Sequence, residues 1–308
     1  MWTKWTVPIK EIKLSTVLAC GQSFRWISEP HGGETVWSMA MAGRVVFLKQ
    51  DDSHIYLRSE PPMKCTEKLV WDYLNLDIKI ASLVEDWQTR DKKVSYRLEG
   101  VRILRQDPWE NLCSFICSSN NNIKRISKMV HSLCTEFGEI VATIDGRPYY
   151  DFPTVAQLAA AKDCETRLRS LGFGYRAKYL ASTAALMAVK PSEYLFALRE
   201  LNYDDARKSL LEFQGVGPKV ADCVCLMSLD KHDCVPVDTH IWQVAKRDYG
   251  LRFDQNAKGY NYVQNHFRTL WGEYAGWAQA VIFAQDLREF KDEEVPAAPP
   301  AKRIKVEA

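Results

Sequence analysis

Lys219 and Asp238 are the two residues whose type and setting best suit covalent chemistry. Lys219 follows Gly215-Val216-Gly217-Pro218, in which two glycines permit a tight turn and the proline fits the first position of a helix. The positive end of that helix disfavours an ammonium in its first turn, which favours the neutral amine of a nucleophile. Asp238 comes 19 residues later (238 − 219), before a helix-like run that it can cap.

The glycine turn also predicts an anion site. A helix, a short hairpin and a second helix leave backbone N–H groups at a helix N-terminus, where they point outward with a partial positive charge. The expected ligand is the phosphate backbone of a nucleic acid. Each residue alone has a simpler interpretation, because a lysine after a hairpin is usually solvated or near a phosphate, and an aspartate before a helix is usually only a cap.

Together, the hairpin, the lysine and the aspartate resemble the helix-hairpin-helix DNA glycosylase superfamily, in its lysine-bearing, strand-cleaving branch. In that family the lysine attacks the sugar carbon of a flipped nucleotide and the aspartate assists. The resemblance therefore implies that Lys219 and Asp238 are catalytic. Monofunctional relatives that remove adenine lack a lysine at this position.

The 308 residues can form one large or two ordinary domains. A formal net charge of +2 neither requires nor excludes DNA as a partner. The first residues, Met1 to Trp5, have no apolar signal core and do not resemble an Arg-rich mitochondrial leader, and no apolar run has membrane-spanning length. We expect a monomer that binds double-stranded DNA and no membrane.

The nine cysteines are odd in number and contain no C-x-x-C pair. This pattern favours reduced thiols in a nucleus or cytosol, and argues against a disulfide framework or a zinc site. The endonuclease-III branch of the resembled superfamily holds an iron–sulfur cluster on four cysteines after its catalytic helices, whereas no cysteine follows Cys234 here. We therefore expect no iron–sulfur cluster, and neither a catalytic metal nor an organic cofactor.

The predicted fold class is α+β, with an N-terminal antiparallel β-sheet domain (1–104) before an all-α, two-lobed domain (105–290) that carries the helix-hairpin-helix motif. Short aromatic and β-branched runs predict strands, and brief turns between them predict antiparallel pairing. The predicted strands are 23–27, 35–39, 44–48 and 54–58.

A helical pattern begins near residue 106. Asp107 and Pro108, with Glu110, form a strong helix start. Further helical segments are expected at 123–137, as several short helices within 153–210, and at 274–284.

The segment Cys20-Gly21-Gln22-Ser23-Phe24-Arg25-Trp26 precedes the first predicted strand. From local chemistry alone Gly21 is a turn residue. The string nevertheless resembles the Gly-Gln-Ser-Phe-Arg-Trp signature of eukaryotic 8-oxoguanine DNA glycosylases. By that resemblance, the carbonyl of Gly21 reads the damaged base.

Asn120, Asn121 and Asn122 predict a loop between two helices, because asparagine tolerates left-handed φ and supplies amide donors. The simpler interpretation is a plain helix–helix turn. The string from Phe115 to Asn122 resembles the same glycosylase family, in which this loop wedges into the space left by the extruded base. Asn120 would then be the wedge, and Arg125 would contact the estranged cytosine.

The segment Leu171 to Tyr179 combines basic and aromatic residues, which suits phosphates and stacking at a disrupted base step. It could equally be a solvated helix start. By resemblance, Tyr175 would prop the bent step open and Arg176 would hold the cytosine opposite.

Gln279 and Phe283 are four residues apart and share one face of the last predicted helix. The simpler interpretation is a core helix with one satisfied glutamine. By resemblance, Gln279 reads the pairing edge of the base, and Phe283 forms an aromatic clamp whose other side is Cys223.

His240 lies just after Asp238, and the resemblance implies that it touches a phosphate, although it could be a structural histidine. Gly215 and Gly217, with Val220, would hold the phosphate backbone through N–H groups, with room for a bridging structural cation.

The resemblance covers about residues 10 to 290 and joins five signatures in the family's order. It implies a bifunctional DNA glycosylase/AP lyase that excises 8-oxoguanine opposite cytosine through a lysine Schiff base and cleaves the strand by β-elimination. Three alternatives remain: a related glycosylase/AP lyase for oxidised pyrimidines, which should lack the Gly21 and triple-asparagine signatures; a non-catalytic helix-hairpin-helix DNA-binding module; and a β-domain protein whose partner is another protein.

The tail from 291 to 308 is charged and proline-rich, and we expect it to be disordered. Its basic cluster, Lys302-Arg303-Ile304-Lys305, resembles a monopartite nuclear import signal. We expect a nuclear protein, and the sequence leaves a mitochondrial form open.

Overall fold

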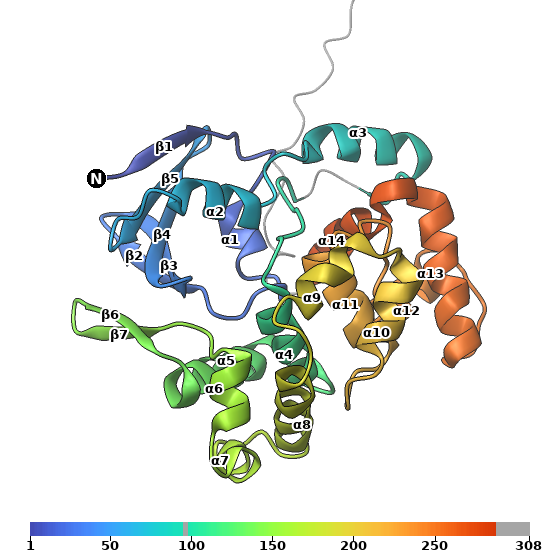
Figure 1. Ribbon diagram of the computed structural model, residues 1–308. Coiled ribbons are helices and arrows are strands. Elements are labelled where there is room, and N and C mark those ends of the chain that lie inside the picture. Colours follow the sequence, from blue (N-terminus) through green and yellow to red (C-terminus); the bar gives the residue numbers. More distant parts are fainter. Residues whose placement is uncertain (95–97, 288–308) are drawn as a thin grey trace, which may run out of the picture.

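The computed structural model of the chain describes residues 1–94 and 98–287. A five-stranded antiparallel sheet comes first, and a larger helical part follows it (Figure 1). The strand order is β1-β5-β4-β3-β2. The predicted fold class, a sheet domain followed by a helical domain, is confirmed. The strands are β1 (Thr3–Thr6), β2 (Ile27–His31), β3 (Glu34–Met41), β4 (Arg44–Gln50) and β5 (His54–Glu60).

The predicted strands at 35–39, 44–48 and 54–58 lie within β3, β4 and β5. The turn between β4 and β5 shows why its sequence ends a strand. One carboxylate oxygen of Asp51 accepts hydrogen bonds from the backbone N–H of Ser53, at 2.8 Å, and of His54, at 2.7 Å. The side chain thus replaces ladder bonds that the backbone cannot make in the turn.

The strand predicted at 23–27 was wrong for residues 23–26, because β2 begins only at Ile27. Gln22, just before these residues, makes its hydrogen bonds to the segment that leads into the helices and not to the sheet. The side chain of Gln22 donates to the carbonyl of Arg102 at 2.8 Å and accepts from the N–H of Leu104 at 3.1 Å. Within the segment itself, the Arg25 side chain binds Glu110, so long-range side-chain contacts and not β propensity decide the conformation.

One face of the sheet packs on α1 (Leu14–Val17) and α2 (Thr66–Tyr73), which the sequence did not predict. Strand β1 was also missed, and it pairs with β5 at the sheet edge. Leu48 and Ile55 are fully buried beneath these helices. Five consecutive residues are buried in both β3 and β4, so the middle of the sheet is covered on both faces.

The helical part contains twelve α-helices within the described residues. They are α3 (Ile80–Arg90), α4 (Pro108–Ser118), α5 (Ile123–Phe137), α6 (Val155–Ala160), α7 (Cys164–Ser170), α8 (Arg176–Ala188), α9 (Tyr194–Ala197), α10 (Tyr203–Leu210), α11 (Pro218–Ser228), α12 (Thr239–Arg247), α13 (Ala257–Trp271) and α14 (Ala275–Asp286). As predicted, Asp107 caps α4, and its side chain accepts from the N–H groups of Trp109 and Glu110.

A two-stranded hairpin, β6 (Ile140–Ile144) and β7 (Arg147–Tyr150), interrupts the helices and was not predicted. It packs on the open face of the sheet. The Tyr149 ring lies 6.2 Å from that of Phe47, and its hydroxyl is 3.0 Å from the hydroxyl of Ser38. The hairpin thus joins the sheet to the helical part.

A buried ion pair makes a second connection. The Arg25 guanidinium donates two hydrogen bonds to the Glu110 carboxylate, at 2.9 and 2.6 Å, and the exposed fractions of the side chains are 5% and 14%. Arg25 also donates to the carbonyls of Ala40, on β3, and Tyr150, on β7. The predicted capping glutamate of α4 therefore serves the contact between sheet and helices.

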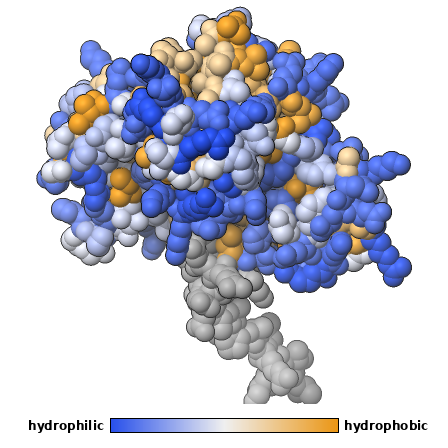
Figure 2. All heavy atoms as spheres, turned by 90° about the horizontal axis from the view of Figure 1, so that it is seen from below, coloured by the Kyte–Doolittle hydropathy of each residue, from blue (hydrophilic) through white to orange (hydrophobic). Residues whose placement is uncertain are grey.

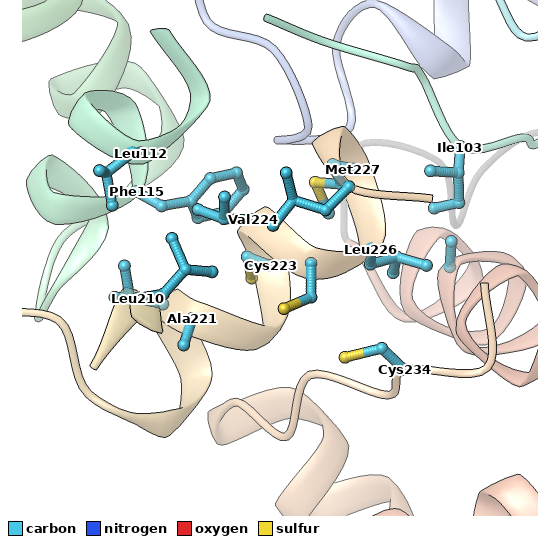
Figure 3. Close-up of a cluster of buried hydrophobic side chains, with 14 of the residues drawn as sticks. Ile103, Leu112, Phe115, Leu210, Ala221, Cys223, Val224, Leu226, Met227 and Cys234 are labelled. Carbon is cyan, nitrogen blue, oxygen red and sulfur yellow. The ribbon is translucent and has the colours of Figure 1, made fainter. Parts of the chain in front are cut away.

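Helix α11 lies at the centre of the largest apolar core, and nine of its eleven residues are buried. Figure 3 shows Leu112 and Phe115 of α4 on one side of α11, with Cys234 on another. Residues 78 to 103 contribute Ile80, Trp87 and Ile103 to this same core. The division of the chain at 104/105 stays a prediction.

The surface in Figure 2 is mostly hydrophilic, with apolar residues in small separate patches. Of the helices described, none combines the length and apolar character needed to cross a bilayer. The predicted nuclear import segment lies outside the described residues.

We predict that Glu110→Gln lowers the free energy of unfolding by about 3 kcal/mol, because it leaves the Arg25 guanidinium buried without a counter-charge. The control is Glu165→Gln, whose partner Arg169 is 50% exposed, and we expect a loss below about 1 kcal/mol. Urea denaturation measures both. Equal losses would show that burial does not strengthen the Arg25 pair.

Candidate active site

The hairpin between α10 and α11 has the predicted form. Gly215 adopts a left-handed φ of 82°, and a Cβ atom there would overlap the ring of Tyr179. Gly217 is the N-cap of α11 with a φ of −93°, and Pro218 is its first residue. Among the described residues, no side chain caps α11. The N-terminal amides, which include that of the buried residue Val220, are thus available to an anion.

Lys219 lies in the first turn of α11, as predicted, and its side chain is half-buried. Its Nζ atom donates a hydrogen bond to Ser118 Oγ at 3.3 Å and lies 4.7 Å from the centroid of the Phe115 ring. Both partners belong to α4. The apolar ring and the hydroxyl hold the amine in one place, at the start of the helix.

Asp238 is the N-cap of α12, as predicted. Its Oδ1 atom accepts a hydrogen bond from the N–H of Ile241 at 2.9 Å, and its backbone is extended. The second oxygen is therefore free of the capping role. A cap of this kind fixes a carboxylate in position.

Cys223 links the two predicted catalytic residues. It is 3% exposed and lies one turn after Lys219 on α11. Burial raises the pKa of its thiol to about 11; the charge of Lys219 acts to lower this pKa, and the charge of Asp238 acts to raise it. The charges of Lys219 and Asp238 therefore both act on this one thiol. At neutral pH the thiol is uncharged.

Gln279 and Phe283 lie on α14, as predicted. Gln279 is 7% exposed, and Phe283 is half-buried. The Phe283 ring meets the ring of His240 edge to face, with centroids 5.3 Å apart, and His240 Nδ1 lies 3.4 Å from a carboxylate oxygen of Asp286. These contacts hold the start of α12, and hence Asp238, against α14.

Gly21 has a left-handed φ of 84°. A Cβ atom at this position would lie 3.1 Å from the Cδ1 atom of Ile123, at the start of α5. The Phe24 ring lies 5.8 Å from that of Phe115, which in turn contacts Lys219. The segment after Gly21 is therefore connected to Lys219 by one shared neighbour, the Phe115 ring.

The three asparagines have different tasks in the loop between α4 and α5. Asn120 is exposed and has the predicted left-handed φ, of 47°. Asn121 donates to the carbonyl of Cys117 at 2.9 Å, and Asn122 caps α5 by accepting from the N–H of Arg125 at 3.0 Å. Asn121 and Asn122 therefore stabilise the loop, and Asn120 is exposed on it.

Tyr175 and Arg176 bind this same loop, although they are more than fifty residues away in sequence. The Tyr175 hydroxyl donates to the carbonyl of Ser119 at 3.1 Å, and Arg176 donates to the carbonyls of Ser119 and Asn120. Arg176 is 3% exposed, whereas Tyr175 is 46% exposed. The exposed Arg125 donates to the carbonyl of Gly172 at 3.5 Å.

Sequence reasoning missed two residues that touch the amine. Ser118 and Phe115 were noted only as parts of the asparagine-loop string, with no role toward Lys219. Their spacing of three places both on one face of α4, which could have indicated a joint contact. Nothing in the sequence shows that this face meets α11.

Across residues 1–94 and 98–287, no group of three or more His, Cys, Asp or Glu side chains is arranged to hold a metal ion. The nine cysteines are all free thiols. Seven of them are buried.

Two protein-family models match the chain in succession. The model described as "8-oxoguanine DNA glycosylase, N-terminal domain" matches residues 4–112. The model described as "HhH-GPD superfamily base excision DNA repair protein" matches residues 113–273, and so contains both Lys219 and Asp238.

Two relatives match nearly the whole chain. The N-glycosylase/DNA lyase of Saccharomyces cerevisiae is 38% identical over 323 residues, which covers 92% of this chain and 86% of the yeast protein. The N-glycosylase/DNA lyase OGG1 of Arabidopsis thaliana is 38% identical over 302 residues, with 92% and 80% covered.

Two solved structures have the same fold. The 8-oxoguanine glycosylase/lyase of Clostridium acetobutylicum, in complex with double-stranded DNA containing cytosine opposite 8-oxoG, matches with a TM-score of 0.77 and 29% identity, covering 89% of this chain and 91% of that one. MBOgg1, in complex with a low affinity DNA ligand, gives a TM-score of 0.82 at 28% identity, with 92% and 94% covered.

We predict that Gly215→Ala lowers the free energy of unfolding by about 2 kcal/mol or more, because the left-handed backbone and the Tyr179 ring both oppose a Cβ atom. Gly217→Ala is the matched control. Its φ is negative and no atom lies within 4 Å of the added carbon, so we expect a change below about 0.5 kcal/mol. Thermal and urea denaturation compare them, and equal losses would contradict the assignment of strain to Gly215.

Proposed function

The chain belongs to the 8-oxoguanine DNA glycosylases of the HhH-GPD superfamily, and we propose that Lys219 is the nucleophile with which it acts. The protein is a bifunctional DNA glycosylase and AP lyase whose substrate is double-stranded DNA containing 8-oxoguanine. The match of the first family model to the sheet domain disfavours the alternative of a glycosylase for oxidised pyrimidines.

The reaction begins when the damaged base leaves the stack, because only then can an amine reach the sugar. Neutral Lys219 attacks C1′, the bond from C1′ to the base breaks, and the base keeps the electron pair and gains a proton. Loss of a proton and opening of the sugar ring give a Schiff base between Nζ and C1′. Removal of a 2′ proton then breaks the bond from C3′ to oxygen, which cleaves the strand on the 3′ side of the lesion.

The observation that supports Lys219 most strongly is its place in the first turn of α11, just after the hairpin, where Ser118 and Phe115 hold its Nζ atom. A phosphate held at the hairpin would bring the sugar next to the amine. The Ser118 hydroxyl and the Phe115 ring, both on α4, hold the nitrogen at the start of α11.

Asp238 has the supporting role. Its carboxylate stabilises positive charge that develops on the sugar and accepts a proton from the attacking amine. The capping bond to Ile241 fixes its position before DNA binds. Preorganised charge of this kind is worth more than charge that must move into place.

We propose that the carbonyl of Gly21 reads the lesion. Normal guanine presents an acceptor at N7, whereas 8-oxoguanine carries a hydrogen there, so a backbone carbonyl favours the damaged base. One such contact is worth about 1 to 3 kcal/mol, or about ten- to a hundredfold, so other steps must add discrimination. Gln279 would read the pairing edge, and Phe283 and the neutral Cys223 thiol would enclose the base.

The loop after α4 would fill the space that the base leaves. In this proposal the exposed Asn120 is the wedge, and Tyr175 supports the bent step. Arg125 and Arg176 would contact the estranged cytosine. Arg176 would first have to release the loop carbonyls that it binds in the free protein, or contact the base with its remaining N–H groups.

Phosphates would bind at the hairpin amides and at His240, and a cation could bridge the hairpin to the backbone. We propose that the chemistry needs no cofactor, since an amine and a carboxylate supply the nucleophile and the base. We further propose that the protein acts as a monomer in the nucleus, on the strength of the basic segment at 302–305.

We predict that Lys219→Gln abolishes covalent trapping by borohydride on a duplex with 8-oxoguanine opposite cytosine, while duplex binding persists. Borohydride reduces a Schiff base to a stable amine, so trapping reports the lysine bond directly. The control is Lys246→Gln, which removes a lysine from the last turn of α12 and should trap like the wild type. Undiminished trapping by the Lys219 variant would remove that residue from the mechanism.

We also predict a pH profile. Because burial raises the pKa of Cys223 to about 11, the thiol stays protonated below that pH, and no ionisation of this group should affect excision near neutrality. The ratio of single-turnover excision rates between the wild type and Cys223→Ser should therefore be constant from about pH 6 to about pH 9. A sigmoidal change of this ratio near neutral pH would indicate a thiolate instead.

A further inference from the structure

Asp222 is a buried carboxylate that the proposed chemistry does not use. It lies on α11 between Lys219 and Cys223, and it is 0% exposed. An unpaired buried charge is strongly destabilising, so this carboxylate needs partners that satisfy it.

Four side chains donate hydrogen bonds to Asp222, and they come from two other helices. From α10, the Tyr203 hydroxyl and the Arg207 Nε atom each lie 2.8 Å from Oδ1. From α13, the Tyr260 hydroxyl lies 2.5 Å, and the Gln264 Nε2 atom 3.0 Å, from Oδ2. The carboxylate therefore holds α10, α11 and α13 together.

The two partners on α13 also hold the segment that leads into Asp238. The Tyr260 hydroxyl accepts a hydrogen bond from the N–H of Val237 at 3.2 Å. The second N–H of the Gln264 amide donates to the carbonyl of Val235 at 3.1 Å. Each side chain thus bonds Asp222 on one side and the backbone just before Asp238 on the other.

The hydrogen bonds that Tyr260 and Gln264 make to Asp222 determine which atoms remain for their bonds to the backbone. The Tyr260 hydroxyl has one proton, and its donation to Asp222 leaves the oxygen lone pair for Val237. The Gln264 amide has two protons, one for each acceptor. Arg207 supplies the charge that favours the carboxylate, whereas burial raises the pKa of Asp222. The carboxylate is the only form that accepts from all four donors at once.

We propose that Asp222 is a positioning residue that, through Tyr260 and Gln264, fixes the 235–237 segment and so sets the place of the Asp238 carboxylate relative to Lys219. This inference rests on the proposed catalytic role of Asp238. A shift of a catalytic group by about 1 Å can cost up to a hundredfold in rate, so a backbone held at both Val235 and Val237 matters to the chemistry.

The competing explanation is that the network only stabilises the fold. Tyr260→Phe and Tyr203→Phe separate the two explanations. Each variant removes one hydroxyl that donates to Asp222, but the two hydroxyls differ in their other contacts. The Tyr260 hydroxyl also bonds the Val237 backbone, whereas the Tyr203 hydroxyl contacts the side chains of Asp222 and Gln264. Both variants should lower Tm.

In single-turnover excision on a duplex with 8-oxoguanine opposite cytosine, well below Tm and with enzyme in excess, we expect Tyr260→Phe to be about tenfold slower than wild type. Tyr203→Phe should slow the reaction by less than about twofold. Duplex affinity should be unchanged in both variants, because the hairpin amides are not part of the network.

The Asp238→Asn background gives the decisive comparison, since the amide oxygen can still cap α12. If Tyr260 acts through Asp238, Tyr260→Phe should change the residual rate by less than about twofold there, while the fall in Tm remains. A tenfold loss in both backgrounds, or equal rates for the two phenol variants, would overturn the positioning role.

Other results would refute the proposed function and not only the positioning role of Asp222. A wild-type protein that does not excise 8-oxoguanine would refute the function itself, whatever the phenol variants do. Full activity of the Asp238→Asn variant would refute the role assigned to that carboxylate. Only when both hold as proposed do the two phenol variants test the network.

Discussion

The chemistry of this protein depends on how one helix is buried. Helix α11 is enclosed along nearly its whole length, and only its first turn is accessible. That turn contains Lys219, the hairpin glycines directly precede it, and no side chain caps it among the described residues. Because the rest of the helix is fixed in the core, the distance between the Lys219 nitrogen and the N-terminal amides of α11 varies little. Binding of a phosphate would then place the neighbouring sugar at the nitrogen without rearrangement of the core.

The proposed chemistry also requires a carboxylate, and another part of the chain, the N-cap of α12, supplies it. Asp238 is held by its own helix through the bond to Ile241, and the preceding backbone is held by Tyr260 and Gln264. Asp222 ties these supports to α11 itself. We propose that this buried network sets the place of the aspartate relative to the lysine. Burial raises the pKa of the Cys223 thiol to about 11, so this group carries no charge at neutral pH.

Much of this could be predicted from sequence, where the information is local. The glycine turn, Pro218 at a helix start and the caps Asp107 and Asp238 follow from backbone preferences within a few residues. The left-handed Asn120 follows from the same kind of preference. Short aromatic and β-branched runs predicted β3, β4 and β5, and the helical repeat of apolar residues predicted α5.

The features that sequence did not reveal depend on distant partners. Residues 23–26 have the composition of a strand, but Arg25 instead binds Glu110, 85 residues away. The β6–β7 hairpin packs on the sheet face, and it was missed although Asp145-Gly146, with left-handed φ at both residues, is a local hairpin signal. The contact of Ser118 with Lys219 and the donors around Asp222 arise only when α4, α10, α11 and α13 meet. Single-sequence patterns do not contain these long-range pairings.

The most direct measurement identifies the atom that bonds to the sugar. The wild-type protein would be incubated with a duplex containing 8-oxoguanine opposite cytosine, reduced with borohydride, and digested for mass spectrometry. We expect a deoxyribose-derived adduct on the peptide that contains Lys219, at its Nζ atom. An adduct on another lysine or on the terminal amine, with an unmodified Lys219, would contradict the central claim.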